Sequence, residues 1–325
     1  MAGVKRTLSV DLGAGLVLPT PVMIASGCAG TGKELAGLVD LHKVGAVVSR
    51  SITLHPQRGS PTPRIAETPA GVVWSTGHQN PGIEAFLTDE LPRLARGTHV
   101  IVSIAGSSLE DFVRLTSILQ GRPEVAAIET CLAGPDEELG RAELGVHADR
   151  AAEVVGAVAR MSLVPTFAKL PIHGPDLGGT AQAVVRAGAH GLTIGGPPPA
   201  LGVHADRLRP ALGAVTGWLS GPAIRPLMLR AVFEVARAVP GTPIVAVGGI
   251  RTGDDAVEAI LAGAWAVQVG TATLIDPDAP VLVAQGIVHY LKAKGLASPA
   301  DVRGRLRVPP SFGALDRDPA QEHPA

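Results

Sequence analysis

Residues 243–271 read PIVAVGGIRTGDDAVEAILAGAWAVQVGT and decide the fold class. PIVAVGG and AVQVGT are short, β-branched runs that end in glycine, which is typical of buried strands. GDDAVEAILAG, between them, has its apolar residues at helical spacing. A strand, a helix and a second strand in this order predict a parallel βαβ unit.

The same unit recurs along the chain. The strand-like runs are PVMIAS (21–26), GAVVSRS (45–51), HVIVSIAG (99–106), VAAIET (125–130), TFAKL (166–170), GLTIGG (191–196), PIVAVGG (243–249) and AVQVGT (266–271). Amphipathic helices are predicted between them, at 108–120, 147–161, 180–188, 226–239 and 253–263. Eight parallel strands that alternate with helices predict an α/β fold, the (β/α)8 TIM barrel.

Three other segments have distinct patterns. LSVDLGAGLVLPTP (8–21) alternates around glycines and predicts an N-terminal β-hairpin that closes the N-terminal end of the barrel. Residues 52–93, rich in Pro, Gly and Thr, are too long for an ordinary connection and follow a strand, so we expect them to belong to the active site. Residues 311–325 have low hydrophobicity and are expected to form a flexible tail, leaving 1–310 as a single barrel domain.

Composition excludes several classes of protein. A net charge of −1 gives no general attraction to nucleic acid. The two cysteines form no metal-binding motif and are too few for a disulfide framework, so we expect no metal and a cytoplasmic location. The sequence has neither a signal-peptide core nor an apolar run long enough to span a membrane.

Glycines at two consecutive strand ends favour a phosphorylated cofactor. Gly248 and Gly249 end the seventh run, and Gly270 and Thr271 end the eighth. Glycine allows a phosphate to approach backbone N–H groups closely at this face of a barrel, although glycines also simply terminate strands. Lys169, in the apolar run TFAKL, needs a buried partner. That partner is either the electron-rich N1–C2=O edge of a flavin or a nearby acid.

Several motifs resemble those of the dihydroorotate dehydrogenase family. They are RGSPTPRIAETPAG (58–71), GHQNPG (77–82), SIAGSS (103–108) and WLSGPAIRP (218–226), and their order matches from about Leu8 to Lys294. The chain looks closest to the soluble class 1 enzymes, because no membrane-binding extension precedes the barrel. The resemblance implies FMN as cofactor, with its phosphate on the glycines and Thr271 named above and Lys169 beside the ring. It places these further residues at the flavin: Ala25, Ser26, Gly27, Arg50, Ser103, Ser220 and Gly221.

On the substrate side the chain departs from the family pattern. Arg50 stands where the family has a lysine, and Trp74 where it has an asparagine. ETCLAGPD aligns with a segment that reads roughly ELNISCPN, so that Cys131 replaces an asparagine and Gly134 the catalytic cysteine. The aligned substrate residues are Trp74, Gly77, His78, Cys131, Gly134, Asp136 and Gly196. The glycines at 134 and 196 predict cleared space opposite a bulky tryptophan, and therefore a larger and less polar substrate than dihydroorotate.

Cys131, His78 and Arg50 are the candidates for the chemistry. Cys131 is either an acid, base or nucleophile or a small packing residue. His78 is a proton donor or a surface histidine of a loop, His173 is placed similarly, and Arg50 can hold a carboxylate. The leading hypothesis is an FMN-dependent oxidoreductase that moves hydride between flavin N5 and a conjugated carbon–carbon bond of a small molecule other than orotate. The alternatives are a flavin-binding protein without turnover and a true dihydroorotate dehydrogenase with an atypical base. The family also implies a homodimer and, in some members, an electron-transfer flavoprotein partner.

Overall fold

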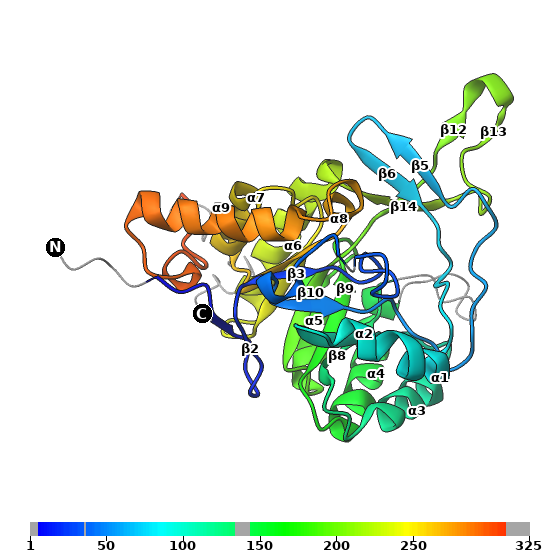
Figure 1. The fold of residues 1–325 in the computed structure, drawn as a ribbon, viewed down its shortest axis with the longest axis horizontal. Coiled ribbons are helices and arrows are strands. Elements are labelled where there is room, and N and C mark those ends of the chain that lie inside the picture. The colour runs from blue at the N-terminus through cyan, green and yellow to red at the C-terminus, as the bar shows by residue number, and fades with distance from the viewer. Residues whose placement is uncertain (1–5, 36, 134–143, 310–325) are drawn as a thin grey trace, which may run out of the picture.

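A computed structural model of the chain describes residues 6–35, 37–133 and 144–309. Eight parallel strands form a closed barrel, hydrogen-bonded in the order β10-β15-β16-β3-β4-β7-β8-β9 (Figure 1). They are β3 (Val22–Ile24), β4 (Ala46–Val48), β7 (His99–Ile104), β8 (Val125–Cys131), β9 (Thr166–Pro171), β10 (Gly191–Gly196), β15 (Ile244–Val247) and β16 (Ala266–Val269). Each lies within or overlaps one of the predicted runs, which confirms the (β/α)8 barrel.

Helices cover the outside of the barrel. The five predicted ones are α3 (Leu109–Leu119), α4 (Ala148–Met161), α5 (Leu177–Arg186), α6 (Arg225–Ala238) and α7 (Gly253–Ala262). After the last strand come α8 (Thr271–Ile275) and α9 (Ala279–Lys294). The short 3-10 helices are η1 (Leu41–Lys43), η3 (Leu144–Val146), η4 (Ala205–Arg207), η5 (Pro222–Ile224) and η6 (Pro299–Asp301). In the described residues between β3 and β4, η1 is the sole helical element.

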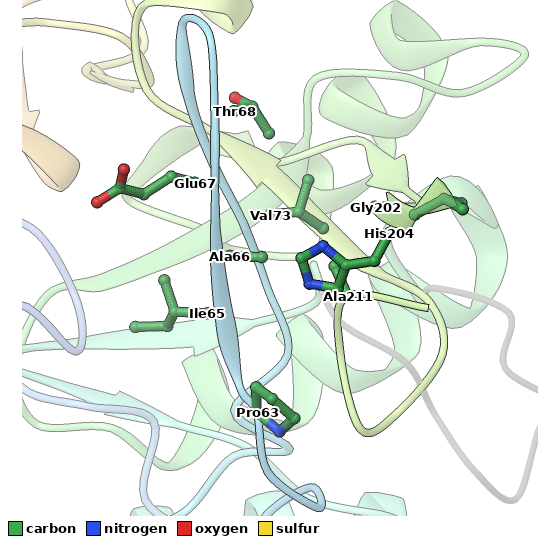
Figure 2. Close-up of a pocket in the computed structure, with 10 residues that line it drawn as sticks. Pro63, Ile65, Ala66, Glu67, Thr68, Val73, Gly202, His204 and Ala211 are labelled. Carbon is green, nitrogen blue, oxygen red and sulfur yellow. The ribbon is translucent and has the colours of Figure 1, made fainter. Parts of the chain in front are cut away.

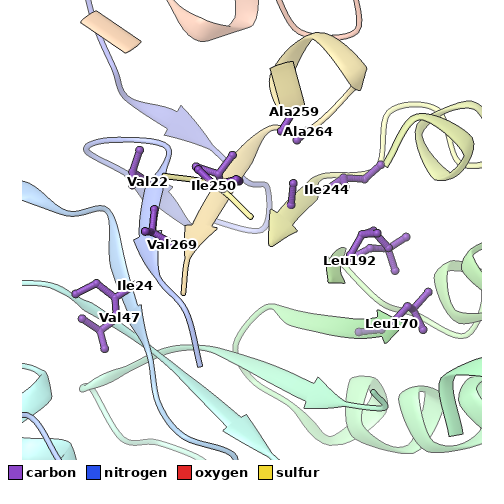
Figure 3. Close-up of a cluster of buried hydrophobic side chains, with 14 of the residues drawn as sticks. Val22, Ile24, Val47, Leu170, Leu192, Ile244, Ile250, Ala259, Ala264 and Val269 are labelled. Carbon is purple, nitrogen blue, oxygen red and sulfur yellow. The ribbon is translucent and has the colours of Figure 1, made fainter. Parts of the chain in front are cut away.

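The barrel strands alternate between two hydrophobic clusters. In β3, Val22 and Ile24 pack outward against the helices, while Met23 belongs to the inner cluster. Figure 3 shows part of the outer cluster. Because side chains of a strand point alternately to its two faces, this alternation fixes which residues point into the barrel.

The N-terminal hairpin closes one end of the barrel, as predicted. Strands β1 (Val10–Asp11) and β2 (Val17–Leu18) pair antiparallel. Leu12 and Leu18 are fully buried and belong to the inner cluster together with Met23 and Phe167. The opposite end, where the strands terminate, is therefore the open mouth.

Two excursions from the barrel pair with each other, which the sequence did not predict. Strands β5 (Ile65–Thr68), β6 (Gly71–Trp74), β14 (Gly217–Ser220) and β11 (Pro199–Ala200) form an antiparallel sheet in the order β11-β14-β6-β5. A hairpin of β12 (Val203–His204) and β13 (Arg209–Pro210) extends beyond it (Figure 1). After β6 the chain returns through α1 (Ile83–Ala85), the π-helix η2 (Phe86–Glu90) and α2 (Leu91–Leu94). The predicted active-site segment is thus largely ordered secondary structure.

Candidate functional site

The predicted strand-end residues share the inward face of the barrel. Met23, Val48, Ile101, Ala127 and Phe167 belong to the inner cluster or pack at the same level. Along each strand, every second residue from these positions toward the mouth also points inward. The inward residues nearest the mouth include five predicted site residues: Ala25, Arg50, Ser103, Cys131 and Lys169. Direct pairing of Cys131 with Lys169 between β8 and β9 supports this placement. The barrel therefore brings these residues together at its mouth.

A buried acid holds Lys169 in place. The Nζ of Lys169 donates to Glu129 Oε1 at 3.3 Å, and the side chains of the two residues are 12% and 1% exposed. Glu129 Oε2 also accepts from Thr193 Oγ1 at 2.9 Å and from Gln268 Nε2 at 3.0 Å. Burial lowers the pKa of Lys169, but the charge and the hydrogen bond of Glu129 oppose this effect, and the pKa lies above 10.5. Lys169 is thus a fixed cation, and the nearby acid is one of the partners that the sequence had predicted for it.

Arg50 has an acidic partner as well. Its Nε lies 3.6 Å from Glu90 Oε2, and its Nη1 donates to the carbonyl of Gln79 at 3.4 Å. The π-helix η2 places Glu90 at its last position, where the residue is buried. Burial raises the pKa of Glu90, and the charge of Arg50 opposes this effect. Arg50 is therefore held at the end of β4 rather than free to swing.

Cys131 lies next to a pair of hydrogen-bonded serines at the mouth. The hydroxyls of Ser51 and Ser103 are 3.0 Å apart, Ser51 hydrogen-bonds the Cys131 side chain, and the Cys131 thiol donates to Ala133 O at 3.6 Å. Burial raises the pKa of the Cys131 thiol, with the charge of Lys169 acting in the opposite direction. The thiol is therefore protonated near neutral pH, which suits a proton donor better than a thiolate nucleophile.

The loop that carries Gly77 and His78 returns over the mouth. Both residues have positive φ, at +61° and +50°. Buried Asn80 fixes the loop, since its Nδ2 donates to His78 O at 2.7 Å and its Oδ1 accepts from Gly82 N at 2.8 Å. Burial lowers the pKa of His78, and the positive charge of Lys169 lowers it further. His78 is thus close to Lys169 and neutral at physiological pH.

The predicted phosphate residues, Gly248, Gly249, Gly270 and Thr271, follow the paired strands β15 and β16, and we call them the glycine cradle. Gly248 and Gly249 have φ of +136° and +74°, which side chains rarely adopt, and a Cβ at Gly249 would lie 2.7 Å from Arg225 Cβ. Thr271 donates to the Ser220 hydroxyl at 3.1 Å, which ties β14 to the start of α8. Backbone N–H groups, small residues and hydroxyls suit a phosphate group. With Lys169 at the floor, the residues present fit FMN.

The remaining predicted flavin residues lie on the same rim. Ser26 donates to Ser49 O at 2.8 Å, which joins the ends of β3 and β4. Gly27 has φ of +82°, and a Cβ there would meet no atom within 4 Å. Gly221 has φ of +102°, and a Cβ there would lie 2.7 Å from Gly71 Cα, so the close approach of β14 and β6 requires glycine.

The expectation of cleared space at Gly196 is wrong. Gly196 is buried, and a Cβ there would lie 2.8 Å from Pro171 Cα and would also contact Ala133 Cβ. The register shift between Ile194 and Gly196 brings β10 close to β9, which removes the space. Gly134 and Asp136 lie outside the described residues.

A separate cavity lies on the four-stranded sheet. Its volume is about 420 Å³, and Ala66, Val73, His204 and Ala211 are among the residues that line it (Figure 2). It contains none of the predicted site residues. The chemistry at the mouth therefore does not take place in this cavity.

Sequence reasoning missed three residues of the site. Glu129 is an acid within the apolar run VAAIET, two residues before Cys131 on the same face, and this pattern could have revealed it. Glu90 and Trp218 carry no comparable local signal, because their partners Arg50 and Trp74 are distant in sequence. Within the described residues, no group of three His, Cys, Asp or Glu side chains is placed to hold a metal, and no helix is long and apolar enough to cross a membrane.

Comparisons with known proteins agree with this architecture. The family model for dihydroorotate dehydrogenase matches residues 8–291. The catalytic subunit of dihydroorotate dehydrogenase B (NAD(+)) from Geotalea daltonii is 41% identical over 94% of this chain and 99% of its own length. The corresponding protein of Desulforudis audaxviator is 45% identical over 87% of this chain and 92% of its own length.

A solved structure shows the same fold. The dihydroorotate dehydrogenase of Eimeria tenella, in complex with ferulenol, superposes with a TM-score of 0.76 over 92% of this chain and 88% of that chain, at 22% identity. Enzymes of this family bind FMN. The chain therefore belongs to the dihydroorotate dehydrogenase family, as an FMN-dependent oxidoreductase of carbon–carbon bonds.

Proposed function

We propose that the chain moves hydride between its flavin and a conjugated carbon–carbon bond of a small molecule other than dihydroorotate. The observation that carries this proposal is the set of side chains at the mouth: a protonated thiol, a neutral imidazole and a held guanidinium. When bound, FMN supplies the hydride chemistry at N5.

Two cations would organise the bound groups. Lys169, fixed by Glu129, would offset the negative charge that a flavin ring gains on reduction. Arg50, oriented by Glu90, would pair with a carboxylate or carbonyl of the substrate, since its planar donors match such oxygens. The raised pKa of Lys169 keeps its proton in place near neutral pH, so the proton transfer needs another group.

Cys131 is the best candidate for that group. Reduction of a conjugated double bond adds hydride to one carbon and a proton to its neighbour, and a buried thiol with a raised pKa can donate that proton. His78 can take part through its neutral ring. In the reverse direction, the oxidation, the Cys131 thiolate would accept the proton.

Dihydroorotate is the second candidate substrate. The relatives at 41% and 45% identity are named as dihydroorotate dehydrogenases, and this favours the same reaction here. Cys131 or water would then have to act as the base. A third possibility is a protein that binds flavin without turnover.

The experiment starts from purified protein saturated with FMN. After anaerobic photoreduction, the enzyme is mixed with orotate, with aliphatic enones and with trans-cinnamate, and flavin reoxidation is followed by absorbance. Reoxidation by an enone or cinnamate but not by orotate supports the proposal. In a separate arm the oxidised enzyme is mixed with dihydroorotate, and rapid flavin reduction there refutes the proposal in favour of the second candidate. Reoxidation by oxygen alone supports the flavin-binding protein without turnover.

We also infer a cytoplasmic homodimer that works with an electron-transfer partner. The relatives are named as catalytic subunits of an NAD(+) enzyme, which implies a further subunit in those enzymes. Light scattering of the purified chain tests the dimer. Co-purification with a flavoprotein from the native cell tests the partner.

A further inference from the structure

Two tryptophans lie side by side on the sheet outside the barrel. Trp74 in β6 is the direct register partner of Trp218 in antiparallel β14. Directly opposed residues of an antiparallel pair point to the same face, with Cβ atoms about 4.5–5.5 Å apart. The two indoles therefore share one face of this sheet.

That face turns toward the mouth of the barrel. Ser220 follows Trp218 by two residues and so shares its face, and the Ser220 hydroxyl accepts from Thr271 at the rim. The opposite face carries Val73, which is 3% exposed and lines the cavity described above (Figure 2). The indoles thus face the flavin site, and Val73 faces away from it.

The strands of the pair also lead to residues of the site. Beyond Trp74 the chain leads within four residues to His78, which is close enough to Lys169 to feel its charge. Neither indole is buried. Part of each ring thus remains available to a ligand that sits between Thr271 and His78.

We propose that Trp74 and Trp218 form an aromatic wall that selects substrates with a flat aromatic ring conjugated to the reacting double bond. This inference rests on the proposed function and names its substrate class. Indole faces stack on flat rings and bury a large apolar area, which a short aliphatic chain cannot match. Arg50 would hold a carboxylate at the other end of such a molecule.

Binding without turnover tests the wall. The probes are trans-cinnamate and trans-crotonate, which share a double bond and a carboxylate and differ mainly in the aromatic ring. Each is titrated into the oxidised, FMN-loaded protein, and the flavin spectrum and tryptophan emission are recorded. The chain has three tryptophans, and Trp265, the third, packs against the Arg303 guanidinium at 3.6 Å. In the Trp265→Phe background, the emission comes from the wall alone.

We expect cinnamate to bind at least about tenfold more tightly than crotonate. Trp218→Gly should weaken cinnamate about tenfold and leave crotonate unchanged, while Trp265→Phe should change neither. Trp218→Leu keeps an apolar side chain on β14 and checks that a loss reflects the ring rather than misfolding. Equal affinity of the two probes, orotate binding more tightly than cinnamate, or no response to cinnamate would overturn the wall.

This result is separable from that of the turnover experiment. Tight, Trp218-dependent binding of cinnamate without flavin reoxidation establishes the wall and refutes the proposed reaction. Turnover of an aliphatic enone with no dependence on Trp218 supports the proposed reaction and refutes the wall.

Discussion

Replacing Glu129 with alanine should lower the free energy of unfolding by about 4 kcal/mol. Glu129 is 1% exposed and accepts hydrogen bonds from Lys169, Thr193 and Gln268 inside the barrel. The substitution leaves the Lys169 ammonium without its acid and the two neutral donors without their acceptor. The side chains of Lys169, Thr193 and Gln268 thus share this one carboxylate as their acceptor inside the barrel.

The magnitude follows from the burial of each partner. Removing one member of a buried ion pair costs about 3–5 kcal/mol. The Lys169 side chain is 12% exposed, so water at the mouth can partly solvate its ammonium group once Glu129 is gone. The cost of breaking this ion pair therefore lies at the lower end of the range. Thr193 and Gln268 each add about 0.5–1 kcal/mol for a lost neutral hydrogen bond.

Urea unfolding of the apoprotein measures the effect without the stabilisation that bound FMN adds. Glu153→Ala, at an exposed position of α4, is the matched control and should change stability by less than about 0.5 kcal/mol. The double variant with Lys169→Met should lose less than the two single losses combined, because the pair is coupled. A loss below about 1 kcal/mol for Glu129→Ala, or strictly additive losses, would refute the reasoning.

Three further predictions concern a histidine, a cysteine and a glycine. The pKa of folded His78 lies below 6.5, so the unfolded state binds a proton more readily and the free energy of unfolding falls as pH drops below 6.5. In His78→Gln, unfolding curves measured across that range should show a smaller decrease in the free energy of unfolding. Burial raises the pKa of Cys28 to about 11, so its thiol should be protonated and unreactive at neutral pH. Peptide mapping after iodoacetamide treatment should find little label at Cys28 at neutral pH and more toward pH 11. Rapid labelling of Cys28 at neutral pH would contradict this prediction. Gly249→Ala should weaken FMN binding at least tenfold in fluorescence titration, because φ is +74° and the Cβ would meet Arg225. Gly241→Ala, at φ +84° with no atom within 4 Å of the Cβ, is its control and should leave FMN affinity unchanged.

Local sequence was sufficient for the barrel because its signals are short-range. A strand such as 244–247 and the glycines that follow it lie within a few residues of each other, and so do the capping residues Thr252 and Asp255 that begin α7. The apolar run around Lys169 and the resemblance to the family placed Lys169 and Cys131 at the site, and the two residues are register partners in β9 and β8. The cofactor side of the site was therefore predictable.

The contacts that define the substrate side are long-range. Arg50 meets Glu90 through an irregular π-helix that no periodic pattern predicts. On the cofactor side, Glu129 of β8 likewise meets Lys169 of the neighbouring strand β9 from 40 residues away in the sequence. The predicted space at Gly196 was wrong for the same reason, since the local shift in register between β10 and β9 closes it.

The sequence by itself determined the eight-stranded barrel, the hairpin that closes it and the glycine cradle, because hydrophobic period and glycine conformation act over neighbouring residues. The tertiary structure alone decided that Trp74 and Trp218, from excursions far apart in the chain, become partners in one sheet above the mouth. Pairing between strands depends on which segments the barrel brings together, and no local pattern encodes that choice.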